Sequence, residues 1–325
     1  MRLGVVVPTY GRFGDAAAVL RVIRVVEDLG YDGAWFADHL AIPGYASKWV
    51  PPPVLDPLAV CGVGLGATTR LRFGTDVLVA PYRHPLALAA SVRSLQALGG
   101  DRLVLGIGVG YLEGEFAALG QDCTTRGART DETLRILRAA RTGASIDHVG
   151  VSFEFRDVIP GGAGAGPPLW VGGNAAVARR RAAELGDGWH PLWISPEEYG
   201  AARAEIVALR GTAGLDGPFT FSMSCPRGAV EDTARDWSGA SQAASAPTRP
   251  EFGYVPPLPR ASGGRPRFTG TPDELRTDLD AYAAAGVDHL VVRFWTNAVD
   301  LDEAALVAQM TRFAREVGRF SSASL

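Results

Sequence analysis

The segment Leu29-Gly30-Tyr31-Asp32-Gly33-Ala34-Trp35 contains the end of a helix, a glycine, an aspartate and the start of an apolar strand. The same order returns in Leu185-Gly186-Asp187-Gly188-Trp189 and in Ala285-Gly286-Val287-Asp288-His289-Leu290. Each glycine suits the left-handed backbone position that ends a helix before a short loop to the next strand. The recurrence predicts a chain built from repeated strand–helix units.

Outward from these segments, short apolar runs alternate with stretches of helical periodicity along almost the whole chain. We expect strands at Leu3–Pro8, Ala34–Ala37, Leu71–Val79, Leu103–Ile107, Leu169–Val171, Trp189, Phe219–Met223 and Leu290–Phe294. We expect a first helix capped by Asp15 and ended by Gly30, then helices at Pro57–Ala67, Pro85–Leu98, Arg129–Arg141, Ala175–Leu185, Pro196–Leu209, Pro272–Ala285 and Asp302–Val317. Eight such units favour an α/β protein with a closed (β/α)₈ TIM barrel. An open doubly wound sheet is the alternative.

Length and composition set the class of protein. The chain has 325 residues, 47% of them hydrophobic and 21% charged, with a formal net charge of −3. These values indicate a globular protein and give no reason to expect nucleic acid or an anionic membrane as partner. Cys61, Cys123 and Cys225 form no CxxC pair, which fits free thiols in a reducing cytosol. No signal peptide or transmembrane run is recognisable, so we expect a cytoplasmic protein.

Three insertions, after strands 2, 4 and 7, interrupt the expected barrel of a single domain over residues 1–325. Residues 41–56 are rich in proline and aromatic side chains, and the alternation in His148–Val158 predicts a small hairpin. Residues 225–268 form a Pro/Gly/Ser-rich stretch. We expect that stretch to fold partly over the mouth as a lid, bringing Phe252 and Tyr254 towards the pocket. A disordered surface loop is the alternative.

Residues that follow the strands are the candidates for chemistry, because the active site of a TIM barrel lies at that end. These candidates are Asp38, His39, Asp76, Tyr82, Arg83, His84, Gly108, Val109, Gly110, Tyr111, Gly172, Gly173, Asn174, His190, Arg293, Trp295 and Asn297. Two glycines between a strand and a helix, as in Val171–Ala176, can present backbone N–H groups to a phosphate, or can form only a turn.

Histidine is the other chemical signal. His39 at a strand end can exchange a proton near neutral pH, or can be a structural residue held in one tautomer. His84 reads as structural, and His148 and His289 as surface or loop residues. No spacing of His and acidic residues indicates a metal site, and no GxSxG or cysteine nucleophile signature is present.

Seven motifs in this order resemble the luciferase-like monooxygenase superfamily, and most closely its coenzyme F420 (deazaflavin) branch. They are Trp35–Leu40, Gly74–Val79, Tyr82–Pro85, Leu105–Tyr111, Arg126–Glu132, Gly172–Asn174 and Gly186–Trp189. They cover about residues 1–195, and the helices from Pro272 onward also fit.

The resemblance implies a cofactor ring across the mouth of the barrel. By this resemblance His39 is the candidate acid/base and Asp38 fixes it, with Tyr111 and Tyr82 as rival proton donors. Asp76–Val77 falls where relatives have a bulge with a non-proline cis peptide. Gly108, Val109 and Gly110 would line the ring, and Gly172, Gly173 and Asn174 would hold the cofactor phosphate.

The sequence also departs from relatives that oxidise sugar phosphates. Tyr10 and Tyr111 stand where those relatives have glutamates, and Pro43 stands where they have a tryptophan, so we do not expect glucose 6-phosphate as substrate. Aromatic residues gather at the expected mouth instead: Tyr10, Trp49, Tyr82, Tyr111, Trp193 and Trp295. They predict a bulky, partly apolar small-molecule substrate, although core packing also accounts for such residues.

We therefore expect an F420-dependent oxidoreductase that reduces a C=C or C=N bond by hydride transfer. The alternatives are an FMN-dependent monooxygenase supplied by a partner reductase, and a non-catalytic flavin-binding protein. We also expect a homodimer formed through the helices that carry Val60, Val63, Leu65, Leu86, Leu88 and Val92, unless these residues are core.

Overall fold

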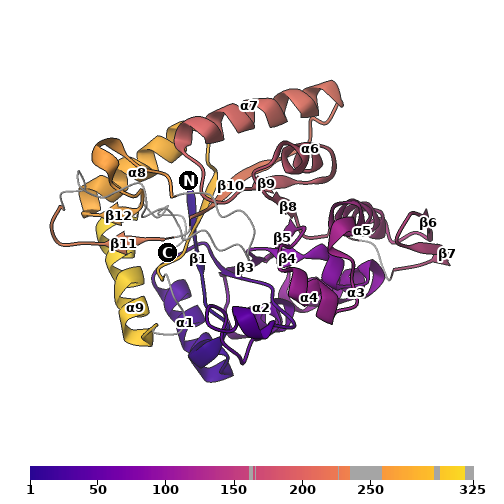
Figure 1. Cartoon of the computed structure of the whole chain (residues 1–325), viewed down its shortest axis with the longest axis horizontal. Helices are drawn as coiled ribbons and strands as arrows, with labels where there is room; N and C mark the ends of the chain where they lie inside the picture. Colours follow the sequence, from indigo (N-terminus) through magenta and orange to yellow (C-terminus); the bar gives the residue numbers. More distant parts are fainter. Residues whose placement is uncertain (161–163, 165, 226, 235–257, 296–300, 319–325) are drawn as a thin grey trace.

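In the computed structural model, the largest sheet is parallel and closes on itself as a barrel. Figure 1 shows its strands in the middle of the molecule with helices outside them. The structure describes residues 1–160, 164, 166–225, 227–234, 258–295 and 301–318. The barrel strands are β1 (Arg2–Val6), β2 (Gly33–Phe36), β3 (Arg72–Thr75), β4 (Leu78–Val79), β5 (Leu103–Gly108), β8 (Leu169–Gly172), β9 (Gly188–His190), β10 (Thr220–Cys225) and β13 (His289–Val292). β3 and β4 share one position, and pairing of β3 with β5 closes the ring. The predicted (β/α)₈ barrel is confirmed, and the open sheet is excluded.

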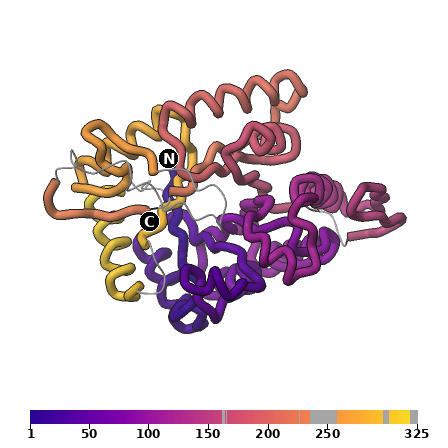
Figure 2. Tube along the Cα trace, viewed as in Figure 1, coloured from indigo at the N-terminus to yellow at the C-terminus, as the bar shows by residue number. Residues whose placement is uncertain are grey.

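Helices surround the strands, as the trace in Figure 2 also shows. They are α1 (Ala16–Asp28), α2 (Pro57–Ala67), α3 (Pro85–Gly99), α4 (Glu113–Ala118), α5 (Arg126–Ala140), α6 (Ala176–Leu185), α7 (Pro196–Thr212), α8 (Pro272–Ala284) and α9 (Glu303–Arg312). The Asp15 carboxylate accepts the Ala18 N–H and caps α1 as predicted. The short helix α4 was not predicted. Among the described residues no helix is long and apolar enough to cross a membrane.

The aspartates of the recurring segment tie neighbouring strands together at the amino-terminal edge of the barrel. Their carboxylates accept backbone N–H groups of the preceding strand: Asp32 from Leu3 at 2.8 Å, Asp187 from Leu169 at 3.0 Å and Asp288 from Phe221 at 2.8 Å. Their backbone carbonyls accept N–H groups on the other side, from Arg72, Thr220 and Arg2 respectively. Each aspartate thus joins its own strand to both neighbours.

The glycines of this segment behave in two ways. Gly30 and Gly286 have φ of 85° and 92° and take the predicted left-handed conformation. Gly186 does not, because its φ is −94°. Its small size is needed for a different reason, since a Cβ there would lie 2.8 Å from the carbonyl oxygen of Ala182.

Aromatic rings fill the inside of the barrel. Trp35 stacks on Trp170 with centroids 5.0 Å apart, and His190 stacks on Trp35 at 5.5 Å. His289 meets both tryptophans edge-on, so its expected place on the surface or in a loop is wrong. It is buried because it begins β13 with its side chain inside the barrel, and burial lowers the pKa of His289 to about 3.

Two of the three expected insertions are described. The predicted hairpin is confirmed as β6 (Ile146–Val149) paired antiparallel with β7 (Glu154–Val158), projecting beyond α5 in Figure 1. Residues 41–56 form a largely irregular loop with one short 3₁₀ turn, Gly44–Ala46. Phe252, Tyr254 and Asn297 lie outside the described residues, so the lid stays a prediction.

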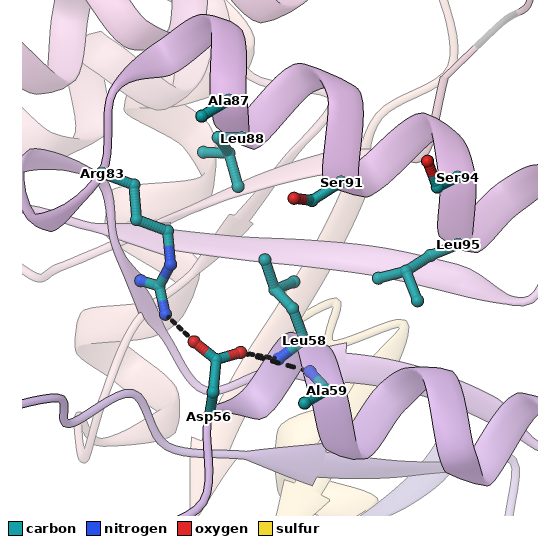
Figure 3. A pocket seen from close by; sticks show the side chains of 9 residues that line it. All are labelled: Asp56, Leu58, Ala59, Arg83, Ala87, Leu88, Ser91, Ser94 and Leu95. Atoms are coloured by element: carbon teal, nitrogen blue, oxygen red, sulfur yellow. Dashed lines mark hydrogen bonds and ion pairs between the residues drawn. The ribbon is translucent and has the colours of Figure 1, made fainter.

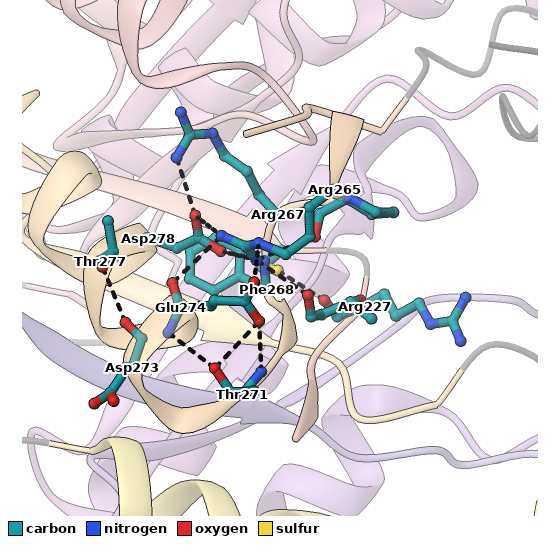
Figure 4. A network of polar contacts seen from close by, with 12 residues as sticks. Arg227, Arg265, Arg267, Phe268, Thr271, Asp273, Glu274, Thr277 and Asp278 are labelled. Atoms are coloured by element: carbon teal, nitrogen blue, oxygen red, sulfur yellow. Dashed lines mark hydrogen bonds and ion pairs between the residues drawn. The ribbon is translucent and has the colours of Figure 1, made fainter. Parts of the chain in front are cut away.

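The return from the third insertion is anchored on α8. Buried Asp278 accepts hydrogen bonds from the Arg265 guanidinium at 2.8 and 2.9 Å, from Arg267 at 3.0 Å and from the Phe268 N–H at 2.7 Å (Figure 4). Nearby, β11 (Ala229–Val230) pairs with β12 (Thr269–Gly270). These bonds fix the two described ends of the insertion next to each other.

Most of the residues expected at a dimer interface belong to the core. Val60, Leu65, Leu88 and Val92 are buried within the chain itself. Val63 is the one exposed residue of the six, with 53% of its surface accessible, and Leu86 is half-buried. The homodimer therefore stays a prediction that rests on fewer residues.

Candidate active site

The predicted site residues come together at the carboxyl-terminal mouth of the barrel. Asp38 and His39 follow β2, Asp76–Val77 separates β3 from β4, Gly108–Gly110 ends β5, and Gly172–Asn174 ends β8. In parallel strands these ends face the same side of the barrel. The peptide bond between Asp76 and Val77 is cis, as the resemblance implied.

His39 is held by a carboxylate that the sequence did not single out. Its Nδ1 lies 3.1 Å from Glu115 Oε2, and the Tyr82 hydroxyl donates to the same oxygen at 3.0 Å. The backbone N–H groups of Leu40 and Ala41 donate to the other oxygen of Glu115. Burial acts to raise the pKa of Glu115, but the bonds from His39 and the two amides outweigh it and the pKa lies below its ordinary value. Glu115 is therefore ionised and only accepts.

This arrangement determines the state of the imidazole. Because Glu115 cannot donate, Nδ1 of His39 carries the hydrogen of that bond. Among the described residues Nε2 of His39 has no hydrogen-bond partner, and the ring packs edge-on against Tyr111 at 6.3 Å. Tyr111 is 48% exposed, so this contact is at the open side of the mouth. Nε2 is the nitrogen that can exchange a proton with a bound molecule.

Asp38 does not fix His39. Its carboxylate accepts two bonds from the Arg83 guanidinium, at 2.6 and 2.9 Å, and one from the Val79 N–H at 2.8 Å. Arg83 also binds Asp56, at the edge of a groove of about 340 Å³ between α2 and α3 (Figure 3). Burial raises the pKa of Asp38 although Arg83 opposes it. Asp38 stabilises the loop after β4, and Glu115 has the orienting role that was expected of Asp38.

Glu115 was missed because it lies in α4, a helix of only six residues. The local signal was the acidic pair Glu113 and Glu115 shortly after the fourth strand position. Only burial distinguishes the two, since Glu113 is exposed and Glu115 is buried.

Asp76 is the centre of a second buried network. It lies 3.1 Å from His190 Nε2 and accepts the Ser224 hydroxyl at 3.0 Å, and His190 Nδ1 lies 2.8 Å from the Ser222 oxygen. Burial acts to raise the pKa of Asp76, but His190, then Arg293 and Ser224, lower it below its ordinary value. Asp76 is an ionised residue beneath the mouth.

Val77 explains two of the predicted glycines. A Cβ on Gly108 would lie 2.4 Å from Val77 Cγ2, and a Cβ on Gly172 would lie 3.2 Å from Val77 Cγ1. Gly110 is restricted in the same way, by Val79 and Phe116. The small residues at the end of β5 are thus required by the packing of the protein itself, and they bring its backbone close to the mouth.

The glycine-rich turn after β8 presents backbone and not side chain. The Asn174 amide is occupied, because Nδ2 donates to the Leu192 carbonyl and Oδ1 accepts the Leu192 N–H at 2.9 Å. Gly173 has φ of 113°, and Ala175 caps α6 without a side-chain hydrogen bond. The first N–H groups of α6 are the part of this turn suited to an anion.

The predicted aromatic lining divides into core and mouth. Tyr10 and Trp295 are nearly buried and pack edge-to-face at 5.6 Å. Burial, and after it Glu115, raises the pKa of Tyr82, whose hydroxyl already donates to Glu115, so Tyr82 is a poor rival to His39. Among the described residues the buried Nε1 of Trp193 has no hydrogen-bond partner. Within the described part of the chain no three His, Cys, Asp or Glu side chains form a metal-binding group.

Known proteins resemble this chain in sequence and in fold. The phthiodiolone/phenolphthiodiolone dimycocerosates ketoreductase of Mycobacterium tuberculosis is 29% identical over 228 residues, which cover 64% of this chain and 59% of that protein. The monooxygenase RslO1 from Streptomyces bottropensis superposes with a TM-score of 0.75 at 20% identity, covering 97% of this chain and 98% of that one. An F420-dependent secondary alcohol dehydrogenase in complex with an F420-acetone adduct gives a TM-score of 0.76 at 16% identity, with the same two coverages.

The family model described as luciferase-like monooxygenase matches residues 1–289. That match spans most of the chain and includes the mouth residues from Asp38 to Asn174. It confirms the resemblance of the seven motifs. The chain therefore belongs to the luciferase-like monooxygenase family, whose members are oxidoreductases and monooxygenases.

Proposed function

We propose that this protein is an F420-dependent oxidoreductase that reduces a polarised C=C or C=N bond of a small, partly apolar substrate. The observation that carries the proposal is the pairing of His39 Nδ1 with buried, ionised Glu115, which leaves Nε2 of the imidazole without a partner among the described residues. Reduction by hydride transfer needs one proton from the protein, and this nitrogen is placed to supply it. The similar ketoreductase and the F420-dependent alcohol dehydrogenase support a hydride-transfer reaction.

The residues of the mouth fit a flavin-like cofactor. The backbone at Gly172 and Gly173 and the uncapped start of α6 offer N–H groups to a phosphate, with the Asn174 side chain holding the turn. Asp76, Val77 and Gly108–Gly110 would hold the ring, with Val109 between the two packing glycines. The buried Nε1 of Trp193, which has no partner in the described part of the chain, is a further donor. When bound in its reduced form, such a cofactor supplies a hydride.

The protein then has three tasks: to orient, to exclude water and to provide the proton. Glu115 keeps the imidazole in one orientation and in one tautomer, with Nε2 left to exchange the proton. Tyr82 and the amides of Leu40 and Ala41 keep Glu115 itself in place. Tyr10, Tyr111 and Trp295 supply apolar surface that restricts water.

Titration of the purified protein with F420 and with FMN, followed by tryptophan fluorescence, tests the cofactor. We expect tighter binding of F420, and no oxygen uptake in the presence of reduced FMN. Tight FMN binding with oxygen consumption would support the two-component monooxygenase instead. Failure to bind either cofactor would refute both enzymatic proposals.

A further inference from the structure

The guanidinium of Arg293, at the mouth of the barrel, makes no hydrogen bond with the described residues. Arg293 follows β13, and its Nη2 lies 3.9 Å from Asp76 Oδ2, which is an ion-pair distance and too long for a hydrogen bond. Its guanidinium lies over the Trp295 ring at 4.6 Å. The side chain is only 25% exposed, and its Nε is buried without a partner. Among the described residues, none of its five N–H groups makes a hydrogen bond.

The carboxylates of the mouth already have other partners. Asp38 is bonded to Arg83, Glu115 to His39 and Tyr82, and Asp76 to His190 and Ser224. The contrast with Arg83 is sharp, since that guanidinium makes three hydrogen bonds to Asp38 and Asp56. A largely buried guanidinium without hydrogen-bond acceptors is costly, because it has lost hydration and gained no hydrogen bond in return.

We propose that Arg293 is an anion subsite that binds a carboxylate or phosphate group of the substrate, while Tyr10 and Trp295 pack against the apolar part beside it. The fork of the guanidinium matches two oxygens of such a group, and stacking on Trp295 fixes the plane of the fork. Tyr10 packs edge-to-face on Trp295. Burial raises the pKa of Tyr10, so its hydroxyl remains protonated and able to donate.

This inference rests on the proposed function, which assigns the turn after β8 and the Val77 region to the cofactor. It makes the substrate a small acid with an aromatic or alicyclic body. An anionic group of the cofactor is a second possible ligand of Arg293, and a titration in the presence of cofactor distinguishes it from a group of the substrate.

Benzoate and inorganic phosphate are the probes, titrated into the full chain and followed by calorimetry and by tryptophan fluorescence. We expect saturable binding to the native protein, weakened at least about tenfold in Arg293→Met and less in Arg293→Lys, which keeps the charge but loses the fork. Arg21→Met is the matched control, because Arg21 pairs with Glu303 on the outer surface. Equal binding to native protein and Arg293→Met, or no saturable binding of either probe to the native protein, would overturn the subsite. If Arg293→Met does not fold, as judged by circular dichroism, Arg293→Lys alone decides.

The source of the anion follows from repeating the titration with saturating cofactor. Binding that persists and still depends on Arg293 supports a substrate subsite. Competition between probe and cofactor would show that Arg293 binds the cofactor, and it would overturn the assignment of Arg293 to the substrate. A protein that binds benzoate through Arg293 but neither F420 nor FMN would refute the proposed function and leave the anion subsite standing.

Discussion

Glu115 shows how one buried side chain decides the chemistry of another. The carboxylate lies 76 positions from His39 in sequence, yet it determines which nitrogen of the imidazole carries hydrogen. A fixed tautomer and a nearby negative charge are what a histidine needs to pick up and release a proton efficiently.

Replacing Glu115 by Gln should lower kcat by about 100-fold or more, because the amide keeps the shape but can donate as well as accept, so that it no longer fixes the tautomer of the imidazole. Cofactor binding should remain within a few-fold of the native value. Steady-state kinetics across pH, together with the fluorescence titration, measures both. Glu113→Gln is the control on the same short helix, and an equal loss of kcat in the two variants would contradict this role for Glu115.

His289 makes a prediction about stability and pH. Its pKa falls to about 3 in the folded barrel, whereas the unfolded chain binds a proton near the ordinary pKa of about 6.5. Between these values the unfolded state holds more protons, so the free energy of unfolding falls as pH falls, with a slope approaching ~1.4 kcal/mol per pH unit. Urea unfolding at pH 7 and pH 5 should show a decrease about 2 kcal/mol larger in the native protein than in His289→Phe. Identical decreases would show that His289 is not the group responsible.

Part of the candidate site could be predicted from the sequence and part could not. Asp38, His39, Asp76 and the glycines were found because strand ends can be located from local pattern and all meet at one edge. Glu115 and the true surroundings of His289 were not found, because their contacts are made between distant segments and through burial, which a local pattern does not contain.

At the scale of elements, α8 offers a comparison within one helix. Asp278 is fully buried beneath Arg265 and Arg267, whereas Asp273 pairs with Arg276 on the surface and is 91% exposed. Asp278→Ala should reduce the free energy of unfolding by roughly 3–5 kcal/mol, since two buried guanidinium groups lose their counter-ion. Asp273→Ala should leave it unchanged.

Chemical denaturation of both variants checks this prediction. A matching loss in the two would mean that the anchor at the end of the insertion contributes no more than a surface pair. Hydrogen exchange at the Phe268 N–H, which donates to Asp278, should rise in Asp278→Ala only.

Long helices with a recognisable first residue were predicted from the sequence, and short helices were not. Helices begun by Asp15, Pro57 or Pro196 were placed within a residue or two, because a cap or a proline marks a helix start in sequence. Helix α4 escaped because one and a half turns carry too little periodicity to be distinguished from loop. The strand predicted as Leu71–Val79 is divided into β3 and β4 at Asp76–Val77, a break that only the family resemblance had indicated.

The chain is expected to form a homodimer through the outer surface of α2 and α3. Val63 on α2 is 53% exposed and Leu98 on α3 is 86% exposed, and both lie on helices that pack together outside the barrel. Light scattering should give the mass of two chains, and Val63→Asp combined with Leu98→Asp should give the mass of one. A native protein that has the mass of one chain at every concentration would end this prediction.

The aspartate ties at the amino-terminal edge have a consequence for how new specificities can arise. Asp32, Asp187 and Asp288 join the strands at the amino-terminal edge of the barrel. The residues proposed for catalysis and for substrate binding lie at the opposite, carboxyl-terminal end. Substitutions of Tyr10, Tyr111 or Trp295 therefore do not affect the hydrogen bonds of these aspartates. Residues at the mouth can therefore change during evolution while the bonds at the amino-terminal edge keep the chain able to fold. A few substitutions at the mouth are then enough to alter which substrate is bound.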